Sequence, residues 1–258
     1  MKTTDELLFD LMVDLKGRKS IPLKNTDRKV LILSTPRSGS TLFCDVLNST
    51  AKIGECREWF NMRYIAAFAK MNKTANINFS DYFNFISQKT IGNTGIFAVN
   101  IHIEQYMAML NNKFDVKSLG FDYIVYLYRK DKISQAVSLS IAQISDQWSS
   151  STNPLQDISG KINTKLISNA LNNIVESEYI YNENFKSMTN IECCYEDFSD
   201  IGSTDCFSNI LENLNIKIPK FRPEAPSKQQ RNDFSNEVKT EFLKYLTGDY
   251  QDDIKVHY

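Results

Sequence analysis

The sequence predicts an α/β protein in which a P-loop-like central parallel sheet is flanked by helices. Short runs of apolar, β-branched residues alternate along the chain with longer stretches that have helical spacing. Such alternation is typical of a parallel sheet with crossover helices. The 258 residues could form one large domain or two smaller ones, and we predict a single domain over residues 1–258.

The expected elements follow from these patterns in chain order. Strands are predicted where the runs are short, apolar and rich in β-branched or aromatic residues, at residues 29–33, 96–103, 123–128 and 191–195. Helices are predicted where apolar residues recur at helical spacing, at residues 7–15, 42–47, 59–71, 82–91, 133–144, 166–185, 206–214 and 238–246. Gly17 is the expected end of the first helix. Residues 216–233 are expected to form a closing loop, because a helix follows them.

The turn after the first strand carries the strongest functional signal. A strand, a polar turn with a glycine and a helix aim several backbone N–H groups and a helix N-terminus at one point, where an anion can bind. Arg37 adds a permanent positive charge to this turn. The predicted anion-binding residues are Pro36, Arg37, Ser38, Gly39, Ser40 and Thr41.

Two other interpretations of the turn are weaker. A Walker A loop needs two glycines with a lysine after the second, whereas this turn has one glycine, with Arg37 before it. An ordinary strand-helix turn would not need an arginine and three hydroxyl groups together.

Several segments together resemble one enzyme family. They are P-R-S-G-S-T-L from Pro36, G-E-C-R-E-W-F from Gly54, F-A-V-N from Phe97, Y-R-K-D-K-I-S-Q-A-V-S-L from Tyr128, Trp148, Y-E-D-F from Tyr195, and Lys228-Gln229. In this order and spacing the chain resembles the Stf0-type bacterial sulfotransferases, whose best-known member sulfates trehalose. The resemblance implies the sulfotransferase fold and a donor, 3′-phosphoadenosine-5′-phosphosulfate (PAPS), which becomes 3′-phosphoadenosine-5′-phosphate (PAP).

The resemblance also implies roles for the residues that bind the donor. The loop would hold the 5′-phosphosulfate, and Arg129 with Ser138 would bind the 3′-phosphate. Ser134 is an alternative hydroxyl for the second role. A second arginine at a second strand end suits a ligand with two separate anionic groups. The alternative interpretation is that Arg129 is a surface residue paired with Asp131 and binds no ligand.

Sulfuryl transfer needs positioning, charge stabilisation and a base for an alcohol acceptor. Arg37 is placed to neutralise the leaving oxygen, and the resemblance implies Glu58 as the base. His102 is the rival base. The alternative interpretation of Glu58 is a carboxylate at a helix N-terminus, and that of His102 is a structural histidine. Glu55 and Trp59 are assigned to the acceptor side. No metal is expected.

The acceptor is less defined than the donor. Asn100 stands where the trehalose-sulfating branch has a lysine, which indicates a different acceptor. A sugar, a glycolipid headgroup or a small natural product with a hydroxyl or amine is expected. A P-loop nucleotide kinase-like enzyme and a non-catalytic relative that binds PAPS or another nucleotide are the alternative functions.

Composition excludes other classes of function. The net charge of −1 does not suggest a polyanion-binding surface, so no nucleic-acid partner is expected, while a homodimer is left open. The start lacks the features of a signal peptide, and no apolar run approaches transmembrane length, so a cytoplasmic protein is expected. The five cysteines have no C-x-x-C spacing and are expected to be reduced buried thiols, with Cys193 and Cys194 on opposite faces of a strand. His257 is expected to be exposed.

Overall fold

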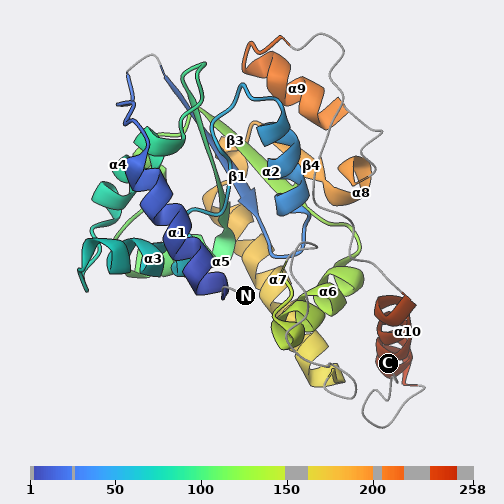
Figure 1. Ribbon diagram of the computed structural model, residues 1–258. Helices are drawn as coiled ribbons and strands as arrows, with labels where there is room; N and C mark the ends of the chain where they lie inside the picture. The colour runs from blue at the N-terminus through green and yellow to red at the C-terminus, as the bar shows by residue number, and fades with distance from the viewer. Residues whose placement is uncertain (1–2, 25–26, 149–161, 200–204, 218–232, 249–258) are drawn as a thin grey trace.

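The computed structural model describes residues 3–24, 27–148, 162–199, 205–217 and 233–248 (Figure 1). Within these ranges a four-stranded parallel sheet has the order β2-β1-β3-β4. Its strands are β1 (Arg28–Ser34), β2 (Ile96–His102), β3 (Tyr123–Tyr128) and β4 (Ile191–Cys194). The predicted α/β class with a parallel sheet is therefore confirmed. No helix in the described ranges is long and apolar enough to cross a membrane.

Helices connect the strands and cover the sheet (Figure 1). Before β2 lie α1 (Thr4–Gly17), α2 (Ser40–Ser49), α3 (Met62–Asn72) and α4 (Phe79–Thr90). After it come α5 (Ile103–Asn111), the 3₁₀ turn η1 (Val116–Leu119), α6 (Lys132–Ser145), α7 (Thr164–Asn184) and η2 (Lys186–Met188). The chain continues beyond β4 with α8 (Tyr195–Phe198), α9 (Asp205–Asn213) and α10 (Asp233–Thr247).

Alternation along β1 divides the core into two layers. Leu31 and Leu33 face a cluster that contains side chains of α1, α3, α4, α5 and α7. Val30 and Ile32 point to the opposite face, where they meet side chains of α2 and α9. This is the period-2 pattern of a strand that is buried on both sides. A third cluster joins α6, α7 and α10.

Two boundaries differ from the sequence prediction because of helix caps. The predicted helix at 59–71 begins only at Met62, since the side chain of Asn61 accepts a hydrogen bond from the Arg63 N–H (3.0 Å). The predicted strand at 96–103 ends at His102, where the unpredicted α5 begins. The side chain of Gln105 in its first turn accepts from the His102 N–H (3.1 Å).

One cysteine prediction is wrong. Cys193 and Cys206 form a disulfide that joins β4 to α9. The expectation of reduced thiols failed here because β4 points Cys193 into the layer that α9 covers, a contact that sequence spacing did not indicate. Cys44, Cys56 and Cys194 are free and buried. The Lys228-Gln229 pair, most of the predicted loop 216–233 and His257 lie outside the described residues.

Candidate active site

A cavity of about 710 Å³ opens where β1, β2 and β3 end. Strand β1 lies between β2 and β3, so the chain forms β2 on one side of β1 and then crosses to form β3 on the other side. Ligands of open parallel sheets bind at this kind of reversal. The cavity wall includes most of the predicted site residues, namely Pro36, Arg37, Gly39, Ser40, Thr41, Glu58, His102, Arg129, Ser134 and Ser138.

The turn between β1 and α2 has a constrained backbone. Gly39 precedes α2 with φ +84°, and a Cβ on it would lie 2.5 Å from the Tyr195 ring. Ser38, although predicted to bind the anion, is fully buried, and its hydroxyl donates to the Thr35 carbonyl (2.7 Å). Ser38 therefore shapes the turn and is not part of the cavity wall.

Gln135 of α6 supports the same turn through hydrogen bonds. Its side chain is fully buried, and its Nε2 donates to Thr35 Oγ1 (2.7 Å) and to the Pro36 carbonyl (2.8 Å). These contacts join α6, the helix that follows β3, to the loop after β1. The glutamine belongs to the segment from Tyr128 that carried the family resemblance, but sequence reasoning gave it no role.

Arg37 reaches across the cavity toward α6. Its Nε donates to Ser138 Oγ (2.9 Å), and its Nη1 donates to the Trp148 carbonyl (2.9 Å). Burial, and then the charge of Arg129, lower the pKa of Arg37. A site that holds two guanidinium groups in one cavity favours an anionic ligand, because such a ligand relieves their repulsion.

Arg129 occupies the end of β3 with its side chain only 11% exposed. Its guanidinium lies 4.7 Å from the centre of the Tyr195 ring, and its Nε is 3.6 Å from Glu196 Oε1. That Nε is buried and has no hydrogen-bond partner among the described residues. The alternative pairing with Asp131 is wrong, because Glu196 takes that place. Tyr195 and Glu196 were missed as site residues, although both belong to the Y-E-D-F segment.

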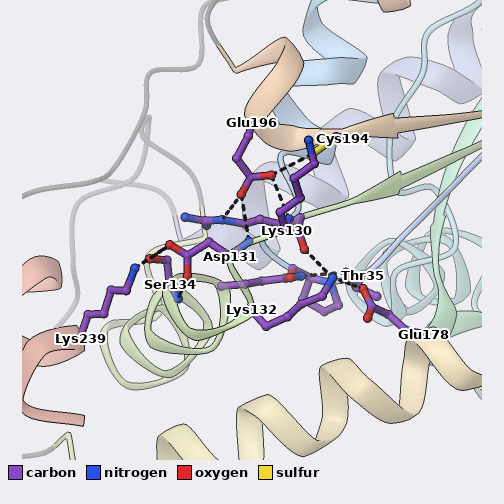
Figure 2. Close-up of polar contacts among 12 residues, drawn as sticks. Thr35, Lys130, Asp131, Lys132, Ser134, Glu178, Cys194, Glu196 and Lys239 are labelled. Carbon is purple, nitrogen blue, oxygen red and sulfur yellow. Dashed lines mark hydrogen bonds and ion pairs between the residues drawn. The ribbon is translucent and has the colours of Figure 1, made fainter. Parts of the chain in front are cut away.

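Figure 2 shows how Glu196 holds the loop after β3. Its carboxylate accepts from the N–H groups of Lys130 (2.9 Å) and Asp131 (3.2 Å) and from the Cys194 thiol (3.0 Å). Burial acts to raise the pKa of Glu196, but these hydrogen bonds outweigh it and lower the pKa. The carboxylate therefore stays charged beside Arg129.

The two candidate serines of α6 have different partners. Ser134 donates its hydroxyl to Asp131 Oδ2 (2.7 Å) and its N–H to Oδ1 (3.0 Å), so Asp131 caps α6 (Figure 2). Ser138 accepts from Arg37 instead. Both side chains line the cavity.

The two candidate bases contact each other. His102 Nε2 lies 3.4 Å from Glu58 Oε1 and 3.3 Å from Ser40 Oγ. A serine–histidine–carboxylate triad needs its two partners on different ring nitrogens, and here both lie at Nε2. The geometry thus does not fit a hydrolase triad. Glu104, on the same side of the cavity, has its pKa raised by burial, which the charge of His102 partly offsets.

The two predicted acceptor-side residues are not part of the cavity wall. Trp59 is fully buried, and its indole N–H donates to the Glu55 carbonyl (2.8 Å). The Glu55 carboxylate pairs with Arg18 and with Arg57, each at 2.8 Å. Both residues therefore stabilise the segment 55–59, which contains Glu58.

Other elements complete the wall. Trp148, 43% exposed, lines the cavity, as does Asn100, whose Oδ1 accepts from Ser34 Oγ (2.8 Å). Thr4 and Leu8 of α1 line it as well, although α1 was expected only from its amphipathic pattern. Within the described ranges, no group of three or more His, Cys, Asp or Glu side chains is arranged to hold a metal ion.

The comparison with protein families agrees with this geometry. The family model of the Stf0 sulphotransferases matches residues 29–244, which include the four strands, except Arg28 at the start of β1, and most of the cavity wall. A search of curated proteins found no match. The family match covers most of the sequence, and the chain therefore belongs to the Stf0 sulphotransferase family.

Proposed function

We propose that this protein transfers a sulfuryl group from PAPS to a hydroxyl or amine of a small acceptor. The observation that carries the proposal is one cavity that holds two arginines from two strand ends, Arg37 and Arg129, together with the carboxylate of Glu58. Such a cavity suits a donor with two separated anionic groups and an acceptor that must lose a proton.

The loop residues fit the phosphosulfate end of the donor. Pro36, Gly39, Ser40 and Thr41 line the cavity where α2 begins, so N–H groups and hydroxyls can bind phosphate oxygens there. Arg37 would stabilise negative charge on the oxygen that leaves. PAPS itself supplies the sulfuryl group, and the transfer needs no metal ion in principle.

Arg129 fits the 3′-phosphate end. Its buried Nε has no hydrogen-bond partner among the described residues, and such a donor gains most from a ligand oxygen. Ser134 and Ser138 are the nearby hydroxyls, and Ser138 already contacts Arg37. The two phosphate sites would therefore be connected through α6.

Glu58 is the proposed general base, with His102 beside it. The carboxylate is 25% exposed and the imidazole 14%, so both are partly shielded while facing the cavity. A sugar, a glycolipid headgroup or a small natural product is the proposed acceptor. Asn100 at the end of β2 leaves that side without the lysine of the trehalose-sulfating branch.

A thermal-shift titration with PAP in the absence of magnesium tests the donor assignment. PAP that binds only the native state raises the free energy of unfolding, by about 2.7 kcal/mol at a hundredfold excess over Kd, and so raises the melting temperature. No response to PAP but a response to magnesium-ATP would favour a kinase-like enzyme instead. PAP binding without transfer in an acceptor screen would favour a non-catalytic relative. The screen incubates cell extract with PAPS and seeks products that gain one sulfuryl group by mass spectrometry.

A further inference from the structure

Two carboxamide side chains bind the same oxygen of Glu58. Gln105 Nε2 donates to Glu58 Oε2 (3.1 Å), and Asn61 Nδ2 donates to that oxygen as well (3.3 Å). The other oxygen, Oε1, lies 3.4 Å from His102 Nε2. All four residues line the cavity. The two carboxylate oxygens thus have different surroundings, although they belong to one group.

The orientation of each carboxamide is set by a backbone donor. Asn61 Oδ1 accepts from the Arg63 N–H (3.0 Å) at the start of α3. Gln105 Oε1 accepts from the His102 N–H (3.1 Å) at the start of α5. A carboxamide oxygen can only accept and its NH₂ can only donate. Because the oxygens face the backbone, both NH₂ groups must face Glu58.

We propose that Asn61 and Gln105 are positioning residues that keep Glu58 Oε1 as the oxygen that takes the acceptor's proton. This inference rests on the proposed sulfuryl transfer. Oε2 already accepts two hydrogen bonds, so it is the less basic oxygen, and Oε1 faces His102 and, beyond it, Ser40. In the reaction the acceptor's O–H or N–H bond breaks and its proton goes to Oε1. The acceptor atom bonds to sulfur, and the bond from sulfur to the 5′-phosphate oxygen breaks, leaving its electron pair on PAP.

Exchange of each carboxamide for a carboxylate separates positioning from helix capping. Asn61→Asp and Gln105→Glu keep an oxygen that can accept from the backbone N–H but remove the NH₂ that binds Glu58. Asn78→Asp is the matched control. Asn78 caps α4 by accepting from the N–H groups of Ser80 (2.8 Å) and Asp81 (3.2 Å), is exposed, and is not part of the cavity wall.

The variants are compared by melting temperature, by calorimetric titration with PAP, and by PAP release from PAPS across pH. Water serves as the acceptor where no better one is known. We expect melting temperatures and PAP affinity close to those of Asn78→Asp, and a kcat lower by on the order of 10²-fold, because a displaced reacting group costs about that much. The acidic limb of the kcat profile should move to higher pH, because Glu58 loses a donor that favours its ionised form and gains a negative neighbour.

A spectroscopic measurement covers the case in which PAP release is too slow to follow or Gln105→Glu fails to fold. The chain has two histidines, so a histidine-labelled NMR spectrum contains one His102 signal, assigned by its loss in His102→Gln. Asn61→Asp should shift this signal through Glu58, whereas Asn78→Asp should not.

The outcomes separate the two proposals. If the wild-type protein fails to bind PAP, the proposed function itself is wrong. If it binds PAP but Asn61→Asp leaves the His102 signal, the kcat and the acidic limb as they are in Asn78→Asp, the positioning role is overturned while the sulfotransferase proposal stands.

Discussion

Arg37 departs from an ordinary turn residue in both its backbone and its side chain. Its φ of +63° lies in the left-handed region, which residues other than glycine seldom adopt. Its guanidinium is held by Ser138 and by the Trp148 carbonyl, and burial lowers its pKa. The sequence indicated the arginine from its place in the turn, but not its partners Ser138 and Trp148, because those lie 101 and 111 residues away in the chain.

The two arginines should differ in kinetics. Arg37→Ala should lower kcat by about 10²–10³-fold with a smaller effect on PAP affinity, because its charge matters most as the leaving oxygen becomes negative. Arg129→Ala should mainly weaken PAP binding, since a 3′-phosphate does not change during transfer. Lys130→Ala, at an exposed neighbouring position, is the control. The reverse pattern in steady-state kinetics and calorimetry would mean that the two phosphate sites are exchanged.

The assignment of the base is testable in the same way. Glu58→Gln retains size but cannot accept a proton, so single-turnover transfer should slow by on the order of 10²–10⁴-fold with PAP affinity nearly unchanged. His102→Gln should have a milder effect, because the imidazole contacts Glu58 and Ser40 without being the proton acceptor proposed here. Near-normal transfer by Glu58→Gln and an inactive His102→Gln would assign the role to His102.

At the scale of elements, the sequence predicted every strand and the major helices of the described ranges, because each has a clear apolar period. It missed α5 and α8, which begin directly where β2 and β4 end. Neither junction contains a glycine or a proline, so the sequence shows no break between strand and helix. It also placed Glu55 and Trp59 on the acceptor side, since it could not show which way a side chain points after α2.

The turn before α2 gives a prediction at this scale. Gly39→Ala should cost about 1–3 kcal/mol in the free energy of unfolding, because φ is positive there and the new Cβ would collide with the Tyr195 ring. Displacement of Tyr195 should also weaken PAP binding, since that ring lies against Arg129. Urea denaturation and calorimetry measure the two effects.

Gly17→Ala is the matched control for the turn, because a Cβ on Gly17 meets no atom within 4 Å and its φ is not positive. It should be neutral or stabilise by about 0.4–1 kcal/mol. Equal effects of the two substitutions would show that the backbone of the turn is not constrained as described.

At the scale of the whole molecule, Asp131 joins α6 to the C-terminal helix α10. It caps α6 through Ser134 and pairs with Lys239 Nζ (2.6 Å). Burial acts to raise the pKa of Asp131, but the bonds from Lys239 and Ser134 prevail and lower it to about 2. Together with the apolar cluster of α6, α7 and α10, this pair attaches the end of the described chain to the rest.

Acid should weaken this attachment. The folded pKa lies below the unfolded value of about 3.9, so the charged carboxylate stabilises the native state above about pH 4 and loses this effect as the pH falls toward 2. Asp131→Asn should therefore be less stable than the wild type at pH 7, and the difference should shrink between pH 4 and pH 2. Urea denaturation across pH measures it. A difference that stays constant over this range would exclude the ion pair as its source.

The position of α1 has a consequence for which part of the chain shapes the cavity. The family model begins at residue 29, yet Thr4 and Leu8, which precede it, form part of the cavity wall. Arg18, just after the helix, is bound to Glu55, close to the segment that carries Glu58. A change in α1 would therefore reshape the cavity without altering any residue of the matched range 29–244. A chain that keeps this matched range and differs only in α1 would offer a cavity of another shape at the same strand ends.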